Sequence, residues 1–301
     1  MKLLAVTAVL ISISNLTGLP FFLANLGIQA QIICQEMTPN LSTARASIES
    51  LMCGKKVSDP ENFLALQGTG LIHIFVVSAG QLVVISEFLI FLGASRGILF
   101  FALVGFTIMT GLQAPCVRSL ISWGFVFFLK RQKLFLTGPQ TVLLSGLLTL
   151  ALFPDWCQSF SLQLSWASAL ALTMASTFKN KNHSKVQHLI ATSIWVFVTL
   201  LPLLQSIGGV HPLSILWNVT LGTITAFFLF PLCILAFLNP FCLLILEKVM
   251  KFFWMLLGLN HEFQTQNQLQ SPSYLGGWLW ILILHLILHI TGIFYQRIYK
   301  T

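Results

Sequence analysis

The chain has 301 residues, of which 56% are hydrophobic and only 8% are charged. A soluble fold covers its surface with far more polar side chains, so this composition excludes a soluble globular protein. The formal net charge is +8. In a membrane protein, basic loops that set the orientation explain such an excess more simply than nucleic-acid binding does.

Apolar runs that are long enough to cross a bilayer follow one another along the sequence. A helix needs roughly 20 residues to cross the hydrocarbon layer, and the alternating segments of a β-barrel are absent. The sequence therefore predicts an all-α polytopic transmembrane helical bundle with about eight to ten spans, including a broken or re-entrant helix.

Residues 1–30 are predicted to be an N-terminal transmembrane anchor. The apolar stretch from Leu3 to about Ile28 is longer than the hydrophobic core of a signal peptide. Gly18 and Pro20 should bend this anchor, because proline interrupts the helical hydrogen bonds.

Residues 31–62 form the longest polar segment, and we expect it to lie outside the cytoplasm. Within it, Ala44–Met52 can form a short surface helix. Cys34 and Cys53 both fall in this segment, where an oxidising compartment could pair them. The spacing of the six cysteines supports neither a zinc ribbon nor a thioredoxin-type site.

The next apolar block, Phe63 to Leu92, is too long for one simple span and contains several small residues. A broken or re-entrant helix fits this block better than a straight one. It opens the predicted membrane core, residues 63–240. Further runs in this core are expected at Ile98–Leu112, Val117–Leu129, Leu134–Phe153, Trp156–Phe178, Val186–Leu204 and Pro212–Leu238.

Residues 241–301 are predicted to contain an interfacial or membrane helix, Phe241–Leu259, followed by a last span at Tyr274–Phe294. Three basic clusters flank apolar runs, at Lys130–Lys133, Lys179–Lys185 and Arg297–Lys300. The first two fit a cytoplasmic placement. The third lies inside only if Phe241–Leu259 crosses the bilayer.

Polar side chains inside apolar runs are costly, so they are candidates for functional positions. The window from His73 to Gln81 combines such side chains with small residues, which suits either a break that lines a hydrated path or tight packing between helices. Arg118 could meet a phosphate or extend to the lipid headgroups. Glu87 needs a partner or a proton, whereas His285 and His289 suit helix packing better than zinc binding.

Four stretches in this order resemble the competence domain of the ComEC family, bacterial inner-membrane proteins that internalise DNA during natural transformation. Gly70 to Ser78 looks like the family's G-x-x-H-L-L-A-I-S signature, and Pro115 to Ser119 looks like P-x-x-R-A. Phe160 to Ser165 resembles F-Q-L-S, and Thr199 to Asn218 contains a T-L-P … V-S-P-L-S … N pattern. The resemblance covers about Arg45 to Leu238.

The resemblance marks a set of polar positions as lining a substrate channel, with Gln81 where the family has a second histidine. Ala79 and Thr223 also depart from the family pattern. The family's external nucleic-acid-binding fold and metallo-hydrolase domain have no counterpart in this sequence, which resembles the membrane part alone. The marked positions are His73, Ser78, Gln81, Arg118, Gln163, Ser165 and Asn218.

These expectations describe a passive conduit for single-stranded DNA in the bacterial inner membrane, and not an enzyme. No phosphate-binding loop is present, so the conduit would depend on a cytoplasmic ATP-driven motor, a separate nuclease and a periplasmic DNA-binding protein. We expect no cofactor and no metal, and association with further copies of the chain stays open. The alternatives are a small-solute or ion-coupled secondary transporter and an intramembrane hydrolase that uses Ser78.

Overall fold

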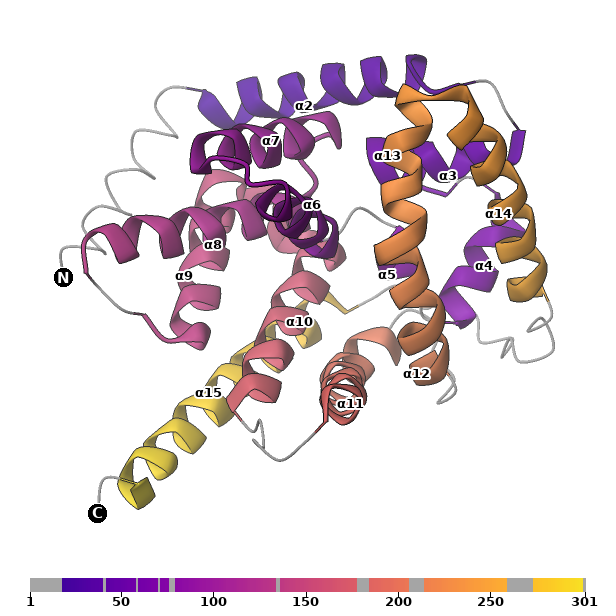
Figure 1. The fold of residues 1–301 in the computed structure, drawn as a ribbon. Coiled ribbons are helices and arrows are strands. Elements are labelled where there is room, and N and C mark those ends of the chain that lie inside the picture. Colours follow the sequence, from indigo (N-terminus) through magenta and orange to yellow (C-terminus); the bar gives the residue numbers. More distant parts are fainter. Residues whose placement is uncertain are drawn as a thin grey trace. The chain divides into compact units, whose positions relative to one another are not determined.

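A computed structural model describes residues 18–39, 42–57, 59–69, 71–75, 79–133, 136–177, 184–205, 214–258 and 273–299. These residues form helices joined by short connections, with no strand in the described ranges, which confirms the predicted all-α class. The chain divides into two compact units (Figure 1). The first contains residues 1–120 and 210–266, and the second contains residues 121–209 and 267–301.

The first unit is built around α3 (Ser42–Cys53). This helix contacts α2 (Leu19–Glu36), α5 (Ile72–Phe75), α7 (Arg96–Met109), α13 (Phe230–Leu238) and α14 (Pro240–Gly258). The unit also contains α4 (Pro60–Gly68), α6 (Ala79–Phe91), the first turns of α8 (Ala114–Arg131), α12 (Ser214–Trp217) and the π-helical segments η2 (Asn218–Gly222) and η3 (Thr225–Leu229).

The sequence predicts α3 at the surface, and that prediction is wrong. Ala44, Ile48 and Leu51 recur at helical spacing and are fully buried, and α14 packs against α3. Apolar residues three and four positions apart lie on one helix face, so this stripe is satisfied by a protein neighbour. The core continues through Phe75, whose ring lies 5.4 Å from that of Phe253.

The second unit is arranged around α10 (Phe160–Thr177), which contacts α9 (Gly138–Leu152), α11 (Lys185–Gln205) and α15 (Tyr274–Tyr299). The short 3₁₀ turn η1 (Pro154–Gln158) connects α9 to α10. One face of α10 is buried through Leu162, Trp166 and Leu170. The spacing of these residues, four apart, places them on one side of the helix.

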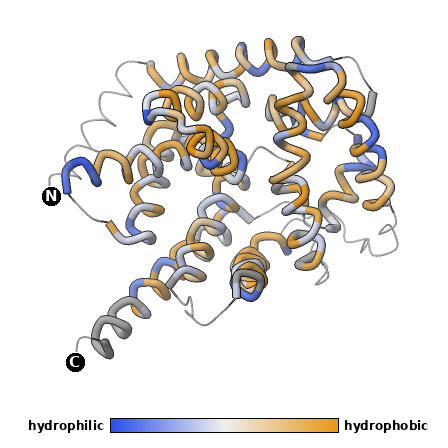
Figure 2. Tube along the Cα trace, in the orientation of Figure 1, coloured by the Kyte–Doolittle hydropathy of each residue, from blue (hydrophilic) through white to orange (hydrophobic). Residues whose placement is uncertain are grey.

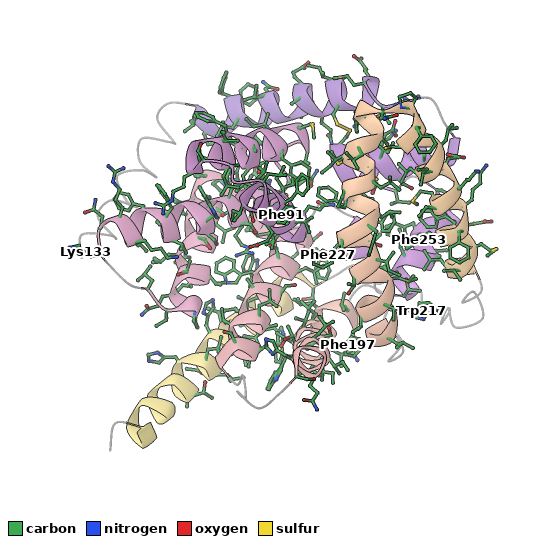
Figure 3. All side chains as sticks on the ribbon, viewed as in Figure 1. Phe91, Lys133, Phe197, Trp217, Phe227 and Phe253 are labelled. Carbon is green, nitrogen blue, oxygen red and sulfur yellow. A yellow bond between two sulfur atoms is a disulfide. The ribbon has the colours of Figure 1, made fainter. Side chains whose placement is uncertain are left out.

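Three described helical stretches are long and apolar enough to cross a membrane: Gln187–Gln205, Val219–Phe237 and Tyr274–Thr291. Three shorter apolar helices are α6, α7 and α9. Figure 2 shows apolar residues along most of the length of the described helices. Large apolar side chains are also exposed, including Phe91, 85% exposed, and Phe227, 64% exposed, both of which are labelled in Figure 3. Exposed apolar surface on this scale requires a lipid environment, so the chain is a membrane protein.

Helix α2 begins at Leu19, after Gly18 in a left-handed conformation, with Pro20 in its first turn. The bend that the sequence predicts at these two residues stays a prediction, because the part of the anchor before Gly18 lies outside the described residues. Helix α2 continues to Glu36, beyond the expected end of the anchor at residue 30. Residues 1–17 lie outside the described part of the chain.

Candidate functional site

The apolar block for which the sequence predicts a broken helix consists of three helices, α4, α5 and α6. Helix α5 ends at Phe75 and α6 begins at Ala79. Residues 76–78 lie outside the described part of the chain, and both helices next to them are bonded to α3. The Ser50 hydroxyl donates a hydrogen bond to the Phe75 carbonyl at 2.6 Å, and the Gln81 side-chain amide donates one to the Leu51 carbonyl at 3.2 Å. Adjacent residues of α3 thus hold the end of α5 and the first turn of α6.

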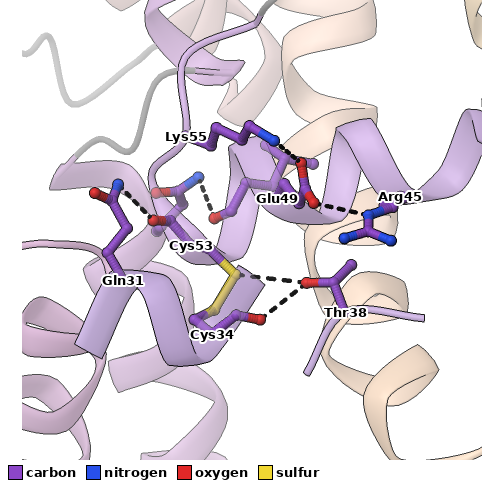
Figure 4. Close-up of a disulfide and its surroundings, with 9 residues drawn as sticks. Gln31, Cys34, Thr38, Arg45, Glu49, Cys53 and Lys55 are labelled. Atoms are coloured by element: carbon purple, nitrogen blue, oxygen red, sulfur yellow. Dashed lines mark hydrogen bonds and ion pairs between the residues drawn. A yellow bond between two sulfur atoms is a disulfide. The ribbon is translucent and has the colours of Figure 1, made fainter. Parts of the chain in front are cut away.

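The same helix carries a buried carboxylate between two basic side chains (Figure 4). Arg45 Nε lies 2.8 Å from Glu49 Oε1, and Lys55 Nζ lies 2.6 Å from Glu49 Oε2. Burial by itself raises the pKa of the Glu49 carboxyl, but the hydrogen bonds and charges of Lys55 and Arg45 outweigh burial and hold that pKa below its usual value. Glu49 is therefore ionised at neutral pH.

The end of α3 is fastened to α2 by a disulfide between Cys34 and Cys53, whose Cα atoms are 5.6 Å apart (Figure 4). Cys34 and Cys53, whose pairing the sequence left open, therefore form a disulfide. Gln31 adds a second link by donating from its side-chain amide to the Cys53 carbonyl at 2.9 Å. Next, Gly54 adopts φ +69°, and a Cβ at this position would clash with the Thr110 carbonyl oxygen. Only glycine fits such a left-handed, closely approached position.

The beginning of α3 is held by a carboxylate from a distant part of the chain. Glu247 on α14 accepts a hydrogen bond from the Ala44 backbone amide at 2.7 Å, and Lys251 lies 3.4 Å from the same carboxylate. A negative charge at a helix N-terminus satisfies unpaired amides and complements the helix dipole. Both ends of α3 are therefore anchored to neighbouring helices of the first unit.

Arg118 lies in the second turn of α8 and is 4% exposed. Its guanidinium donates to the Ser119 hydroxyl at 3.4 Å. Glu87, which the sequence suggested as a charge in need of a partner, is exposed on α6 and forms no ion pair with another described residue. The side chain of Arg118 is consequently held inside the first unit and does not extend to the surface.

Gln163 and Ser165 belong to the second unit. Gln163 is fully buried on α10, and its side-chain amide donates to the Tyr274 carbonyl at the start of α15 at 2.9 Å. Its Oε1 atom is buried without a hydrogen-bond partner in the described structure. Ser165 is half-buried on the same helix. Gln163 thus joins two helices that are far apart in the sequence.

Of the histidine pair of α15, only one member packs inside the unit. His285 Nε2 accepts a hydrogen bond from the indole nitrogen of Trp166 at 3.0 Å, as expected for a packing histidine, whereas His289 is exposed. Within the described ranges, no group of three His, Cys, Asp or Glu side chains could hold a metal ion.

The remaining predicted positions are described only in part. His73 lies in α5 and Asn218 begins the π-helical segment η2, but the side chains of both residues fall outside the described structure. Ser78 lies outside the described residues altogether. Of the seven positions, the structure ties Gln81 to α3 and Gln163 to α15.

Sequence reasoning missed the residues that hold α3 in place. The spacing of Arg45 and Glu49, four apart, was a readable signal of an ion pair on one helix face. Buried Ser50 carries no such signal. The bond between Glu247 and Ala44 joins residues that are 203 positions apart, and periodicity cannot reveal a partner at that distance.

A family model described as competence protein matches residues 51–298 of the chain. No curated protein and no solved structure matches it. The matched range includes α4, α5, α6 and Arg118, parts of both units, and α15 except for its last residue. It covers well over half of the sequence and confirms the resemblance to the ComEC competence domain, so the chain belongs to the competence protein family.

Proposed function

We propose that the protein is a multi-pass component of the bacterial inner membrane that conducts single-stranded DNA during natural transformation. The family match over residues 51–298 carries this proposal. A role in competence follows from the family, and the conduit is the simplest role for a membrane chain in which polar groups are held inside apolar helices.

The arrangement around α3 supports a conduit in the first unit. Helix α4 ends at Gly68 and is followed by a turn at Thr69, so backbone groups of this apolar block lie outside the helical ladder. Such groups lie at membrane depth only where protein or a hydrated path satisfies them. Two polar side chains provide hydrogen bonds between α3 and the helices of this block in the first unit. The Ser50 hydroxyl of α3 donates to the Phe75 carbonyl, and the Gln81 side-chain amide donates to the Leu51 carbonyl of α3. A strand that moves through such a path needs weak polar contacts and not tight binding.

The proposed conduit is passive. Partner proteins would supply the rest of the process: a periplasmic protein that delivers DNA, a nuclease that removes one strand and a cytoplasmic motor that uses ATP. These partners are inferred because a passive path can neither capture DNA, nor degrade a strand, nor hydrolyse ATP.

The test is genetic and has two stages. A strain that lacks the gene should still bind labelled DNA at its surface but should accumulate no nuclease-protected DNA. Loss of surface binding together with uptake, or normal uptake, would contradict the proposal.

Variants of the buried residue Arg118 test whether its guanidinium takes part in DNA uptake. If Arg118 contacts phosphates, Arg118→Lys should retain part of the uptake, because a point charge still attracts phosphate, while Arg118→Gln should lose most of it at unchanged membrane abundance. A purely structural Arg118 would lower abundance and uptake together in both variants. Normal uptake by Arg118→Gln would remove this residue from the path.

A further inference from the structure

The turn after α3 lies on the side of the membrane that faces away from the cytoplasm. Disulfides persist in oxidising compartments and are rare in the cytoplasm. The Cys34–Cys53 disulfide ends two residues before Lys55. The basic side chains around the end of α3 therefore face the compartment from which DNA arrives in the proposed function.

The buried carboxylate of Glu49 orients the side chains of Arg45 and Lys55. The side chain of Glu49 is only 7% exposed, whereas the side chains of Arg45 and Lys55 are 39% and 43% exposed. One buried carboxylate therefore holds two outward-facing cations, and the group as a whole carries one net positive charge. Lys56, the next residue, is also exposed and adds a second charge.

The position of Lys55 is fixed by the backbone as well as by Glu49. The Lys55 amide donates to the Glu49 carbonyl at 3.0 Å, and Gly54 packs against the Thr110 carbonyl. The Gln113 side chain adds a bond to the Gly54 carbonyl at 3.4 Å. A cation held in place in this way loses little conformational freedom when an anion binds, which favours association.

One neighbouring acidic group, Asp59, is engaged in a helix cap. The Asp59 carboxylate caps the start of α4, where it accepts from the Glu61 amide at 3.2 Å and from the Asn62 side chain at 2.5 Å. Residues 55 to 62 are mostly polar and their described members are largely exposed, which is typical of a segment in water. These surroundings favour a dissolved polyanion over a lipid headgroup as the ligand.

We propose that Lys55, with Arg45 beside it and Glu49 as the residue that orients both, forms an entry site for the phosphodiester backbone of single-stranded DNA. The entry site lies close in sequence to Ser50 and Leu51, which bond Phe75 of α5 and Gln81 of α6. A phosphate that is attracted to Lys55 is thus delivered close to these two helices. This inference rests on the proposed function and adds the external point of contact.

The test measures binding of a fluorescent oligothymidylate to the purified full-length protein in nanodiscs of phosphatidylcholine, over a range of salt concentrations. Loss of one phosphate contact should lower the slope of log K against log salt by about 0.7. We expect Lys55→Gln to show this reduction and to weaken binding about fivefold at low salt. Lys55→Arg should restore both quantities.

Lys248→Gln is the matched control, because Lys248 is an exposed lysine of the same unit with no ion pair in the described structure. It changes the net charge equally and should leave the slope unchanged. An unchanged slope in Lys55→Gln, or an equal reduction of the slope in both variants, would overturn the entry site. The proposed function would still stand in that case if the wild-type protein bound the oligonucleotide.

Two further outcomes distinguish failure of the entry site from failure of the proposed function. If the wild-type protein does not bind the oligonucleotide at low salt, the proposed function itself fails. If phosphatidylglycerol vesicles bind wild type but not Lys55→Gln, while DNA binding is equal in the two proteins, then the patch recognises a lipid headgroup and the entry site for DNA is wrong.

Discussion

Glu49 makes the stability of the protein depend on pH in acid. Its lowered pKa means that the folded state favours the carboxylate, so this stabilisation is complete above the usual value of 4.5 and is lost as the pH falls through the lowered pKa. We expect Glu49→Gln to cost about 1–2 kcal/mol at neutral pH, because two ion-paired hydrogen bonds with half-exposed partners are removed.

Thermal unfolding of the purified protein at several pH values checks this expectation. The difference between wild type and Glu49→Gln should shrink in acid below the lowered pKa. Glu61→Gln removes an exposed carboxylate with no ion pair in the described chain, and it should have little effect at any pH. A constant difference between wild type and Glu49→Gln across the whole pH range would contradict the electrostatic role.

Gly146 is a second residue whose identity the structure explains. A Cβ on Gly146 would clash with three ring atoms of Trp166. The indole cannot retreat easily, because it is buried, bonded to His285 and packed edge-on against Trp278. Gly146→Ala should therefore destabilise the second unit by about 1–3 kcal/mol through overpacking.

Gly124→Ala is the control, since a Cβ there meets open space and should stabilise α8 by about 0.5–1 kcal/mol. The melting temperatures of the two variants should thus move in opposite directions. Trp166→Phe, which shortens the clashing ring, should recover part of the loss in the Gly146→Ala background. Equal melting temperatures for the two alanine variants would refute the packing argument.

At the scale of elements, the contact between α3 and the end of α5 depends on the hydroxyl of Ser50. Ser50→Ala leaves the Phe75 carbonyl without this donor, and an unsatisfied buried carbonyl costs about 1–3 kcal/mol. We expect faster hydrogen exchange in α6 and a lower melting temperature. Ser86→Ala is the control, because the Ser86 hydroxyl bonds only the Val83 carbonyl of its own helix, and it should change neither quantity.

Threonine hydroxyls bond backbone carbonyls within the π-helical turns of η2 and η3. Thr220, Thr223 and Thr225 each donate to the carbonyl four residues earlier, at distances of 2.8, 2.5 and 2.8 Å. Thr107 and Thr149 make the same bond within the regular helices α7 and α9. Such back-bonding therefore accompanies the π-helical turns but is not sufficient to cause them.

At the scale of the whole molecule, apolar runs are enough to predict most of the helices. The run Val186–Leu204 corresponds to α11 and Trp156–Phe178 to α10, with ends shifted by a few residues, because long hydrophobic periodicity is a strong signal. The surface position predicted for α3 is wrong, since its apolar stripe could face lipid, water or protein. Only tertiary packing decides that choice.

The candidate site is predictable only in part, because the sequence marks polar residues within apolar runs but does not show their tertiary contacts. The sequence places Gln81 and Gln163 inside apolar runs and therefore marks them, but it cannot show that Gln81 bonds the Leu51 carbonyl or that Gln163 bonds the Tyr274 carbonyl. Those partners are backbone groups, and every residue carries one.

The orientation of the chain is a prediction that labelling can check. In a background without free cysteines, Lys56→Cys should react with an impermeant maleimide applied outside intact cells, because the disulfide places this turn away from the cytoplasm. Arg131→Cys, at the basic end of α8, should react only after the cells are opened. External labelling of position 131 would show that the predicted orientation is wrong. Lys181, predicted on the same side, lies outside the described residues.

The π-helical turns also have an evolutionary consequence. A π turn contains one residue more than an α turn, so the loss of one residue from such a turn restores regular helical geometry. Leu221 in η2 and Leu229 in η3 are both buried. Relatives that lack one residue between positions 218 and 229 should close a regular helix here and preserve both contacts. Sequence alignments of the family should accordingly carry single-residue gaps at this point.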